Sequence, residues 1–204
     1  FYFDIESQEY ITYPYDHVKV SFNRANNTFT ITTDDGTKYI FDILEKSSSA
    51  PTTSGTYVEN YTTWWVSKIQ NSNNTDEISF LYGSENHHFF SSSSTTRYYQ
   101  VGTNNNCLGA PPPLDYENVV TQTWYAAKPL SKILFKGGSV EFIGFSAERE
   151  DLEGGHALQS IKVLNESQQV IKQFDLTFFY ASGGGGTNGC IGFDSRANKW
   201  LFLQ

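Results

Sequence analysis

Three carboxylates in one short segment are the first groups that could perform chemistry. Glu148, Glu150 and Asp151 surround Arg149, and a glycosidase works with two carboxylates placed on either side of a sugar. Neighbours within one segment rarely face each other across a cleft, however. We therefore predict an exposed acidic turn with a local ion pair, and we predict that the chain is not an enzyme.

Histidines and glycines offer two further kinds of site. His87 and His88 are adjacent, and in a strand neighbouring side chains point to opposite faces, so the two cannot chelate one metal ion together. The run Gly183–Gly186 lacks the Lys and Ser/Thr that complete a phosphate-binding loop. The sequence therefore predicts neither a metal site nor a cofactor.

Tryptophans give the strongest indication of a binding surface. Trp64, Trp65 and Trp124 could form an aromatic platform for sugars, because the flat apolar face of a sugar ring stacks on an aromatic ring. Trp64 and Trp65 are adjacent, so one of them faces inward and the other outward if the segment is a strand. The alternative is that these rings pack in the sheet, where aromatic residues are enriched in any case.

The two cysteines, Cys107 and Cys190, both lie in loop-like sequence rich in Asn and Gly. Two cysteines in loops form a disulfide in an oxidising compartment. Two unpaired thiols are the alternative, and the spacing of the cysteines does not distinguish a disulfide from free thiols. Neither cysteine has a second ligand at the short spacing that zinc sites use.

Alternating apolar and polar residues define the elements that must position these groups. Thr28–Thr32 and Thr37–Phe41 flank Asp35-Gly36, a strong hairpin signal. Further strands are predicted at Val18–Phe22, Lys132–Phe135, Ser139–Phe142, Ser160–Leu164 and Val170–Phe174, with Asp175–Tyr180 prolonging the last of these. The sequence thus predicts an all-β fold, an antiparallel meander of twisted hairpins packed as a sandwich or partial roll.

The remaining segments complete this prediction. Arg149–Gly154 is the best candidate for a single helical turn ended by glycine. Long polar loops are predicted at Lys46–Ser54, Asn104–Pro113 and Ser182–Gly189, and Lys199–Leu203 is expected to be a final strand without a partner. We expect residues 1–204 to form one β-rich domain, with a subdivision near 104–113 as the alternative.

Charge and composition limit the partners. The chain carries 14 Lys and Arg against 22 Asp and Glu, a net charge of -8, which argues against a nucleic-acid partner because such binding needs a basic surface. No apolar run reaches the roughly 18 residues of a membrane span. The chain contains no Met and starts at Phe1, so we expect a segment of a larger protein.

The order of the strands resembles a known family. The successive segments Asp35–Phe41, Thr63–Ile69 and Ile78–Tyr82, and later Leu130–Ile133, Gly138–Phe142 and Leu158–Ile161, resemble the non-repeat region of Rhs/YD-repeat-like large surface proteins of Bacteroidetes-type bacteria. The resemblance implies a secreted or outer-surface protein, and it implies no catalytic residues.

Together these observations favour a non-enzymatic function. We expect a structural or scaffold segment of a large secreted or cell-surface bacterial protein, with adhesion as an added role. Its partners would be the rest of its own parent chain, and surface glycans or proteins. The alternative is a carbohydrate-binding β-sandwich module.

Overall fold

The computed structural model describes residues 1–7, 9–51, 56–98, 114–182 and 199–204. The fold is all-β and antiparallel, as predicted, and the described residues contain no helix. Thirteen strands form one large sheet: β1 (Tyr2–Asp4), β2 (Glu9–Ile11), β3 (Lys19–Asn23), β4 (Thr28–Thr32), β5 (Lys38–Pro51), β6 (Val58–Gln70), β7 (Glu77–Tyr82), β8 (Glu85–Tyr98), β9 (Leu114–Ala127), β10 (Leu130–Phe135), β11 (Gly138–Glu148), β12 (His156–Asn165) and β13 (Val170–Asp175). A second, two-stranded sheet contains β14 (Phe178–Ser182) and β15 (Lys199–Leu203).

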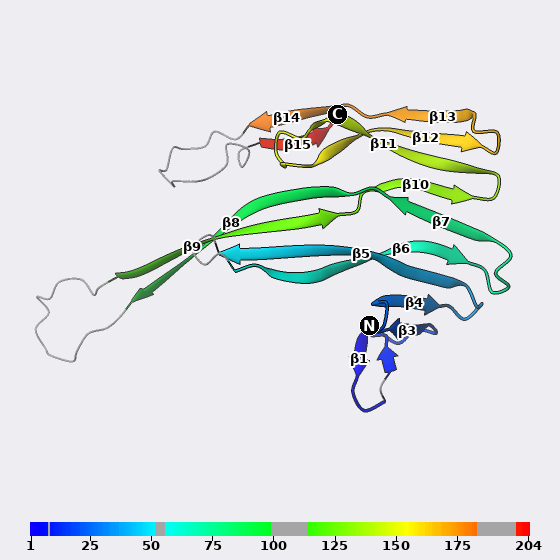
Figure 1. The fold of residues 1–204 in the computed structure, drawn as a ribbon, viewed down its shortest axis with the longest axis horizontal. Helices are drawn as coiled ribbons and strands as arrows, with labels where there is room; N and C mark the ends of the chain where they lie inside the picture. Colours follow the sequence, from blue (N-terminus) through cyan, green and yellow to red (C-terminus); the bar gives the residue numbers. More distant parts are fainter. Residues whose placement is uncertain (8, 52–55, 99–113, 183–198) are drawn as a thin grey trace, which may run out of the picture.

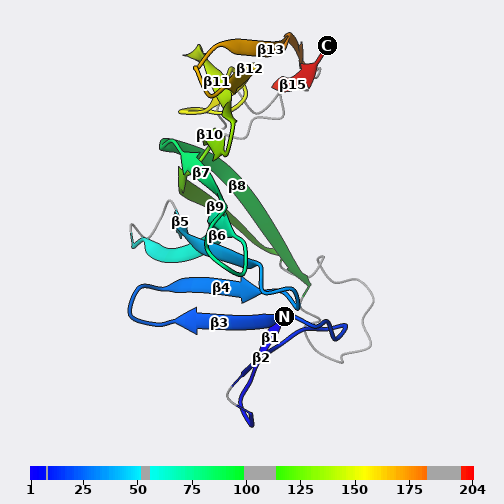
Figure 2. The same cartoon turned by 90° about the vertical axis from the view of Figure 1, so that its right-hand side faces the viewer.

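The large sheet is open and forks at β5. Its main path runs β1-β2-β3-β4-β5-β6-β7-β10-β11-β12-β13, so β1 and β13 lie at its two ends. The second half of β5 also pairs with β9, which in turn pairs with β8. Figures 1 and 2 show the strands stacked from β1 and β2 at one end to β13 and β15 at the other. The N- and C-termini therefore lie at opposite ends of the stack.

Apolar residues line up directly opposite one another across neighbouring strands. Such cross-strand pairs share one face of a sheet, and residues two apart on a strand share it as well. One row crosses β2 to β7 through Tyr10, Val20, Ile31, Tyr39, Ile69 and Ile78. The adjoining row crosses β7 to β12 through Phe80, Ile133, Val140 and Val163. We call these ten residues the apolar face.

The opposite face is polar in the centre of the sheet. Lys68 on β6 forms an ion pair with Glu77 on β7 at 3.1 Å, and Lys132 on β10 forms one with Glu141 on β11 at 2.9 Å. These ion pairs join neighbouring strands on the side away from the apolar face. Where the register is regular, alternation thus places apolar and charged side chains on opposite faces, and register shifts interrupt it between β5 and β6, β7 and β10, β11 and β12, and β12 and β13.

No second layer buries the apolar face in the part of the chain that the structure describes. The only buried apolar residues there are Val20, Ala50 and Leu164. Most of the apolar face is half-buried, and Ile78 is 38% exposed. A compact domain of this length buries most of its apolar surface, so this sheet is a single layer with an incomplete core.

A group of aromatic rings packs around Phe29 near the N-terminal end of the sheet. The ring of Phe29 lies 4.5 Å from Phe22, 5.4 Å from Trp64, 5.6 Å from Tyr10 and 5.7 Å from Phe1, measured between centroids. We call these five residues the aromatic cluster. It joins β2, β3, β4 and β6 to the N-terminal residue.

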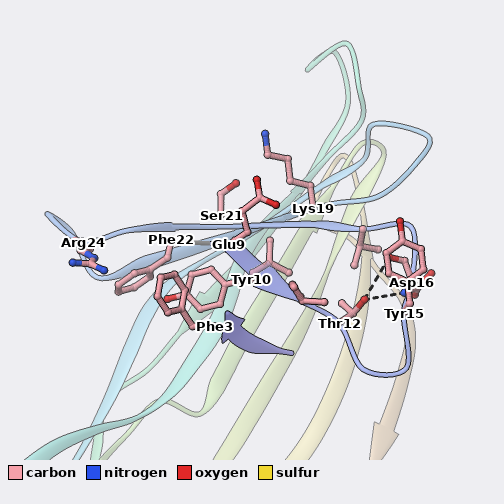
Figure 3. Close-up of a pocket in the computed structure, with 13 residues that line it drawn as sticks. Phe3, Glu9, Tyr10, Thr12, Tyr15, Asp16, Lys19, Ser21, Phe22 and Arg24 are labelled. Carbon is pink, nitrogen blue, oxygen red and sulfur yellow. Dashed lines mark hydrogen bonds between the residues drawn. The ribbon is translucent and has the colours of Figure 1, made fainter. Parts of the chain in front are cut away.

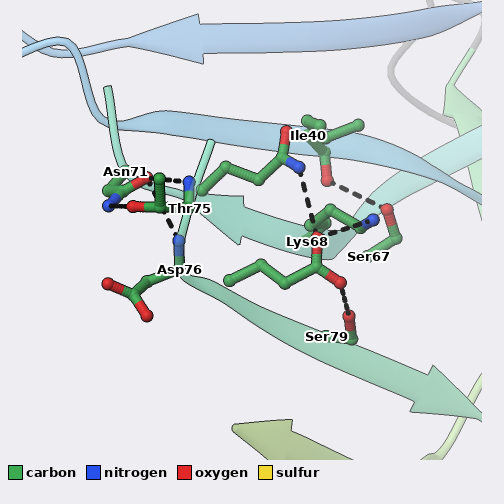
Figure 4. Close-up of polar contacts among 9 residues, drawn as sticks. Ile40, Ser67, Lys68, Asn71, Thr75, Asp76 and Ser79 are labelled. Atoms are coloured by element: carbon green, nitrogen blue, oxygen red, sulfur yellow. Dashed lines mark hydrogen bonds and ion pairs between the residues drawn. The ribbon is translucent and has the colours of Figure 1, made fainter. Parts of the chain in front are cut away.

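The predicted hairpins are confirmed, and short side chains determine their turns. Between β4 and β5 the Asp35 carboxylate accepts hydrogen bonds from the Thr33 hydroxyl at 2.6 Å and from the Thr37 amide at 2.9 Å. These bonds, that from Thr33 foremost, hold the pKa of Asp35 below its ordinary value. Between β6 and β7 the Asn71 side chain accepts from the Thr75 and Asp76 amides (Figure 4). Both turns are thus stabilised from within the hairpin.

Two turn glycines give a prediction about these hairpins. Gly36 and Gly137 both have a positive φ, of 82° and 95°, which is strained for any residue with a Cβ. A Cβ at Gly36 would lie 2.8 Å from the Cβ of Ser72, whereas a Cβ at Gly137 would meet nothing within 4 Å. We expect Gly137→Ala to lower the free energy of unfolding by about 1 kcal/mol, and Gly36→Ala by about 2–3 kcal/mol because of the added clash. Urea unfolding followed by circular dichroism measures both, and equal losses would contradict the structure.

Three expectations from the sequence are wrong. Lys46–Pro51 is not a loop but the second half of β5, because it is hydrogen-bonded on both sides, to β6 and to β9. Arg149–Gly154 forms bends, a bridge at Glu153 and a turn at Gly154, and no helix. Lys199–Leu203 has a partner after all, since β15 pairs with β14 from Phe178 to Ser182.

Other expectations are refined or lie beyond the described residues. The strand expected to continue from Asp175 to Tyr180 is broken at Leu176 and Thr177, between β13 and β14. The predicted loop at Asn104–Pro113, where a subdivision was the alternative, lies outside the described residues. So does the predicted loop at Ser182–Gly189 beyond Ser182, which is the last residue of β14.

Candidate functional site

The edge strand β13 is the most exposed element of the sheet. Every one of its residues is exposed, including Val170 at 51%, Ile171 at 67% and Phe174 at 45%. The Leu176 amide donates to Gln159 O, so it points toward β12. In an antiparallel ladder this direction alternates along the strand. The backbone N–H and C=O groups of Gln173 and Asp175 therefore point out of the sheet, up to the register shift at Ile171.

An open groove lies at the other end of the sheet, between the β1–β2 hairpin and β3. It arises because β2 and β3 are paired at one position only, Tyr10 with Val20, and diverge on either side. Its volume is about 740 Å³, and aromatic, acidic and basic side chains line it together (Figure 3). The labelled lining residues are Phe3, Glu9, Tyr10, Thr12, Tyr15, Asp16, Lys19, Ser21, Phe22 and Arg24. A groove between diverging strands is suited to contact with another polypeptide segment.

Trp64, the first residue of the predicted platform, is half-buried against its neighbours. Its ring belongs to the aromatic cluster, and its indole N–H donates to Asn27 O at 2.9 Å. Tyr61 lies on the same side of β6, with its ring 6.5 Å away. Trp64 therefore anchors β6 to β4 and to the turn between β3 and β4, which contains Asn27.

Trp65 and Trp124 are both exposed, but on different parts of the sheet. Trp65 points to the face of β6 opposite to Trp64, as adjacent strand residues must; it is 39% exposed and donates to Glu45 at 3.3 Å. Trp124 on β9 is 38% exposed, and its ring lies 4.4 Å from that of His88. The structure thus brings Trp124 together with His88 and not with Trp64, an arrangement that residue spacing alone did not indicate.

The histidines and glutamates form a junction between β8 and the start of β12. Glu85 contacts His87 at 2.8 Å and His156 at 3.2 Å, and His88 contacts Glu153 at 2.9 Å. A bridge in the backbone also joins His88 to Glu153. His87 and His88 have separate partners, as their alternation predicts, and the described residues contain no group of three or more His, Cys, Asp or Glu arranged to bind a metal ion.

The acidic segment beside Arg149 connects the two sheets. Arg149 holds Asp151 through two hydrogen bonds of 2.9 and 2.8 Å, which is the predicted local ion pair. Asp151 also accepts from the Leu201 amide of β15 at 3.2 Å, and Glu150 forms an ion pair with Lys199. The hydrogen bonds from Arg149, more than any other contact, hold the pKa of Asp151 below its ordinary value. These carboxylates therefore attach the second sheet to the first.

The structure gives no information on the two cysteines. Cys107 and Cys190, the pair for which a disulfide was one alternative, both lie outside the described residues.

In the ranges that the structure describes, no helix is long and apolar enough to cross a membrane. The comparison of the chain with family models, with curated proteins and with solved structures found no match.

Proposed function

We propose that the chain is a non-enzymatic structural segment of a larger protein. The observation that carries this proposal is the open single-layered sheet: among the described residues its apolar face is only half-buried, and its end strands β1 and β13 each pair on one side. An exposed strand edge is a template for further pairing, and a half-covered apolar face marks a surface that packs against another one. Both features suit a segment whose sheet is completed by neighbouring parts of a larger assembly.

The parent protein in this proposal is a large secreted or cell-surface bacterial protein of the Rhs/YD-repeat-like kind. The strand order from Asp35 to Ile161 supports this, because it resembles the non-repeat region of those proteins. In this setting the partner of the sheet is the remainder of the same chain. Adhesion to surface proteins or glycans is an added role, for which the mixed groove between β1–β2 and β3 offers a contact surface.

Hydrogen exchange followed by mass spectrometry tests the scaffold proposal. We expect the peptides that cover β13 to exchange rapidly in the 204-residue chain, because the Gln173 and Asp175 amides point out of the sheet, and to be protected in the full-length secreted product. Peptides from β12, which is paired on both sides, serve as the internal control and are expected to be protected in both samples. Rapid exchange of β13 in the full-length product would show that its edge stays open, and the proposal would fail.

Carbohydrate binding is the second candidate function, and Trp124 favours it. This ring is exposed, yet its orientation is supported by His88. A rigid, accessible aromatic ring is the feature that sugar rings stack on. Of the three tryptophans of the predicted platform, this proposal uses Trp124 alone, because Trp64 is half-buried against Phe29 and Trp65 lies on the opposite face of β6.

A further inference from the structure

Four strands place a set of polar and aromatic residues on the face that carries Trp124. Trp124 on β9 pairs directly with Ser48 on β5 and with His88 on β8, and Ser48 pairs with Glu59 on β6. Directly paired side chains share a face. Glu59, Ser48, Trp124 and His88 therefore form one continuous row across β6, β5, β9 and β8.

A second row runs beside the first on the same face. Each of its members lies two residues away from a member of the first row on the same strand. In this second row Tyr61 pairs with Lys46, Lys46 with Ala126, and Ala126 with Asn86. The two rows enclose a hollow of about 270 Å³ that is lined by residues of both, among them Lys46, Ser48, Glu59, Asn86, Trp124 and Ala126. We call it the Trp124 hollow. The small side chains of Ser48 and Ala126 form the floor of the hollow, and the larger side chains around them form its walls.

The charged groups at the hollow neutralise each other. Lys46 Nζ lies 2.6 Å from Glu59 Oε1, and it also lies 5.0 Å from the centre of the Tyr61 ring. Both charged side chains remain accessible, at 43% for Lys46 and 61% for Glu59. The hollow thus offers hydrogen-bond donors and acceptors with no net charge, so it favours an uncharged polar ligand over an ion.

The aromatic wall of the hollow is preorganised. The Trp124 ring lies 4.4 Å from the His88 ring at an interplanar angle of 31°, and His88 is itself fixed by Glu153 at 2.9 Å. A side chain held before binding loses less conformational freedom when a ligand arrives. The exposed face of this indole is therefore a stable surface for stacking.

We propose that the Trp124 hollow binds one uncharged hexopyranose unit of a glycan. The apolar face of the sugar stacks on Trp124, and its hydroxyl groups exchange hydrogen bonds with Lys46, Glu59 and Asn86. The hollow is slightly smaller than the roughly 300 Å³ at which pockets for small molecules begin, which suits one sugar ring and not a long oligosaccharide. This inference rests on the second function above, carbohydrate binding, and is independent of the scaffold role.

Titration of the 204-residue chain with methyl glucoside, methyl galactoside and methyl mannoside, followed by NMR chemical shifts, tests the site. We expect at least one of these probes to bind with millimolar affinity and to shift the indole N–H signal of Trp124. Trp124→Ala is expected to weaken binding by about tenfold or more, because stacking on an aromatic ring is lost. Trp65→Ala is the matched control, since it removes an equally exposed indole from a separate part of the sheet and is expected to leave binding unchanged.

A second variant protects the test against misfolding of Trp124→Ala. Glu59→Gln changes an exposed side chain and its ion pair with Lys46, and we expect it to weaken binding severalfold because a charged hydrogen bond becomes a neutral one. If a sugar binds and neither Trp124→Ala nor Glu59→Gln changes its affinity, the assigned site is wrong while carbohydrate binding stands. If no probe binds and a glycan array is also blank, the site and the carbohydrate-binding function both fail.

Discussion

Replacing Phe29 by alanine is expected to lower the free energy of unfolding by about 3 kcal/mol. Phe29 is the centre of the aromatic cluster, where its ring contacts Phe1, Tyr10, Phe22 and Trp64. Phe29 is half-buried, and four other rings lie within 5.7 Å of its ring, so its removal takes away the contact that these rings share. Urea unfolding followed by circular dichroism gives the loss directly.

The control for this prediction is another apolar residue on a strand. Ile171 on β13 is 67% exposed, so Ile171→Ala removes little packing and is expected to cost less than about 1 kcal/mol. If the two variants lost the same free energy, the aromatic cluster would not be the packed centre of the sheet. Trp64 fluorescence adds a local readout, because its ring lies against Phe29.

Asp151→Asn is expected to weaken the attachment of the second sheet to the first by about 2 kcal/mol. The substitution removes the charged partner of Arg149 and weakens the acceptor of the Leu201 amide. The Asp151 side chain is only 12% exposed, so water replaces the lost interactions poorly. Faster hydrogen exchange at Leu201 and along β14 would report the release.

The neighbouring carboxylate provides the control for Asp151. Glu150 forms an ion pair with Lys199, but its side chain is 53% exposed, and exposed ion pairs contribute little. Glu150→Gln is therefore expected to leave the exchange of β14 nearly unchanged. Equal release by both variants would mean that total charge, and not the Arg149–Asp151 contact, holds the second sheet.

The contribution of Asp151 is expected to depend on pH in one direction. Its pKa is below the ordinary value of 3.8, so the folded state favours the charged form. The stabilisation is complete above that ordinary pKa and disappears as the pH falls through the lower folded pKa. The difference in stability between the wild type and Asp151→Asn should thus be constant above about pH 5 and shrink below about pH 4. A stability difference that grew on acidification would contradict a lowered pKa of Asp151 in the folded state.

Local hairpins could be predicted from the sequence, whereas the connections between them could not. The Asp35-Gly36 turn and its flanking strands follow from residues that are close together in the chain. Ser47, Ser48 and Ser49 have no apolar alternation and look like a loop. They form a strand because β6 and β9 bond to both sides of it, and such distant pairing leaves no local pattern.

The same limit applies to the candidate sites. The opposite directions of Trp64 and Trp65 follow from the alternation of one strand, and the sequence predicts them. The contact between Glu85 and His156 joins residues 71 positions apart, and the hollow beside Trp124 combines four strands. Only the register between strands brings these groups together, so residue types and spacing could identify Trp124 as a candidate but not its neighbours.

Residue-resolved amide exchange along β13, measured by NMR on the 204-residue chain, tests the central claim most directly. If the sheet ends at an open edge, the amides of Lys172, Phe174 and Leu176 are protected by β12, while those of Gln173 and Asp175 exchange as freely as in an unfolded peptide. This alternation is the predicted result. Uniform protection of all five amides would show that another strand already covers the edge, and it would contradict the account of an open sheet built to be continued.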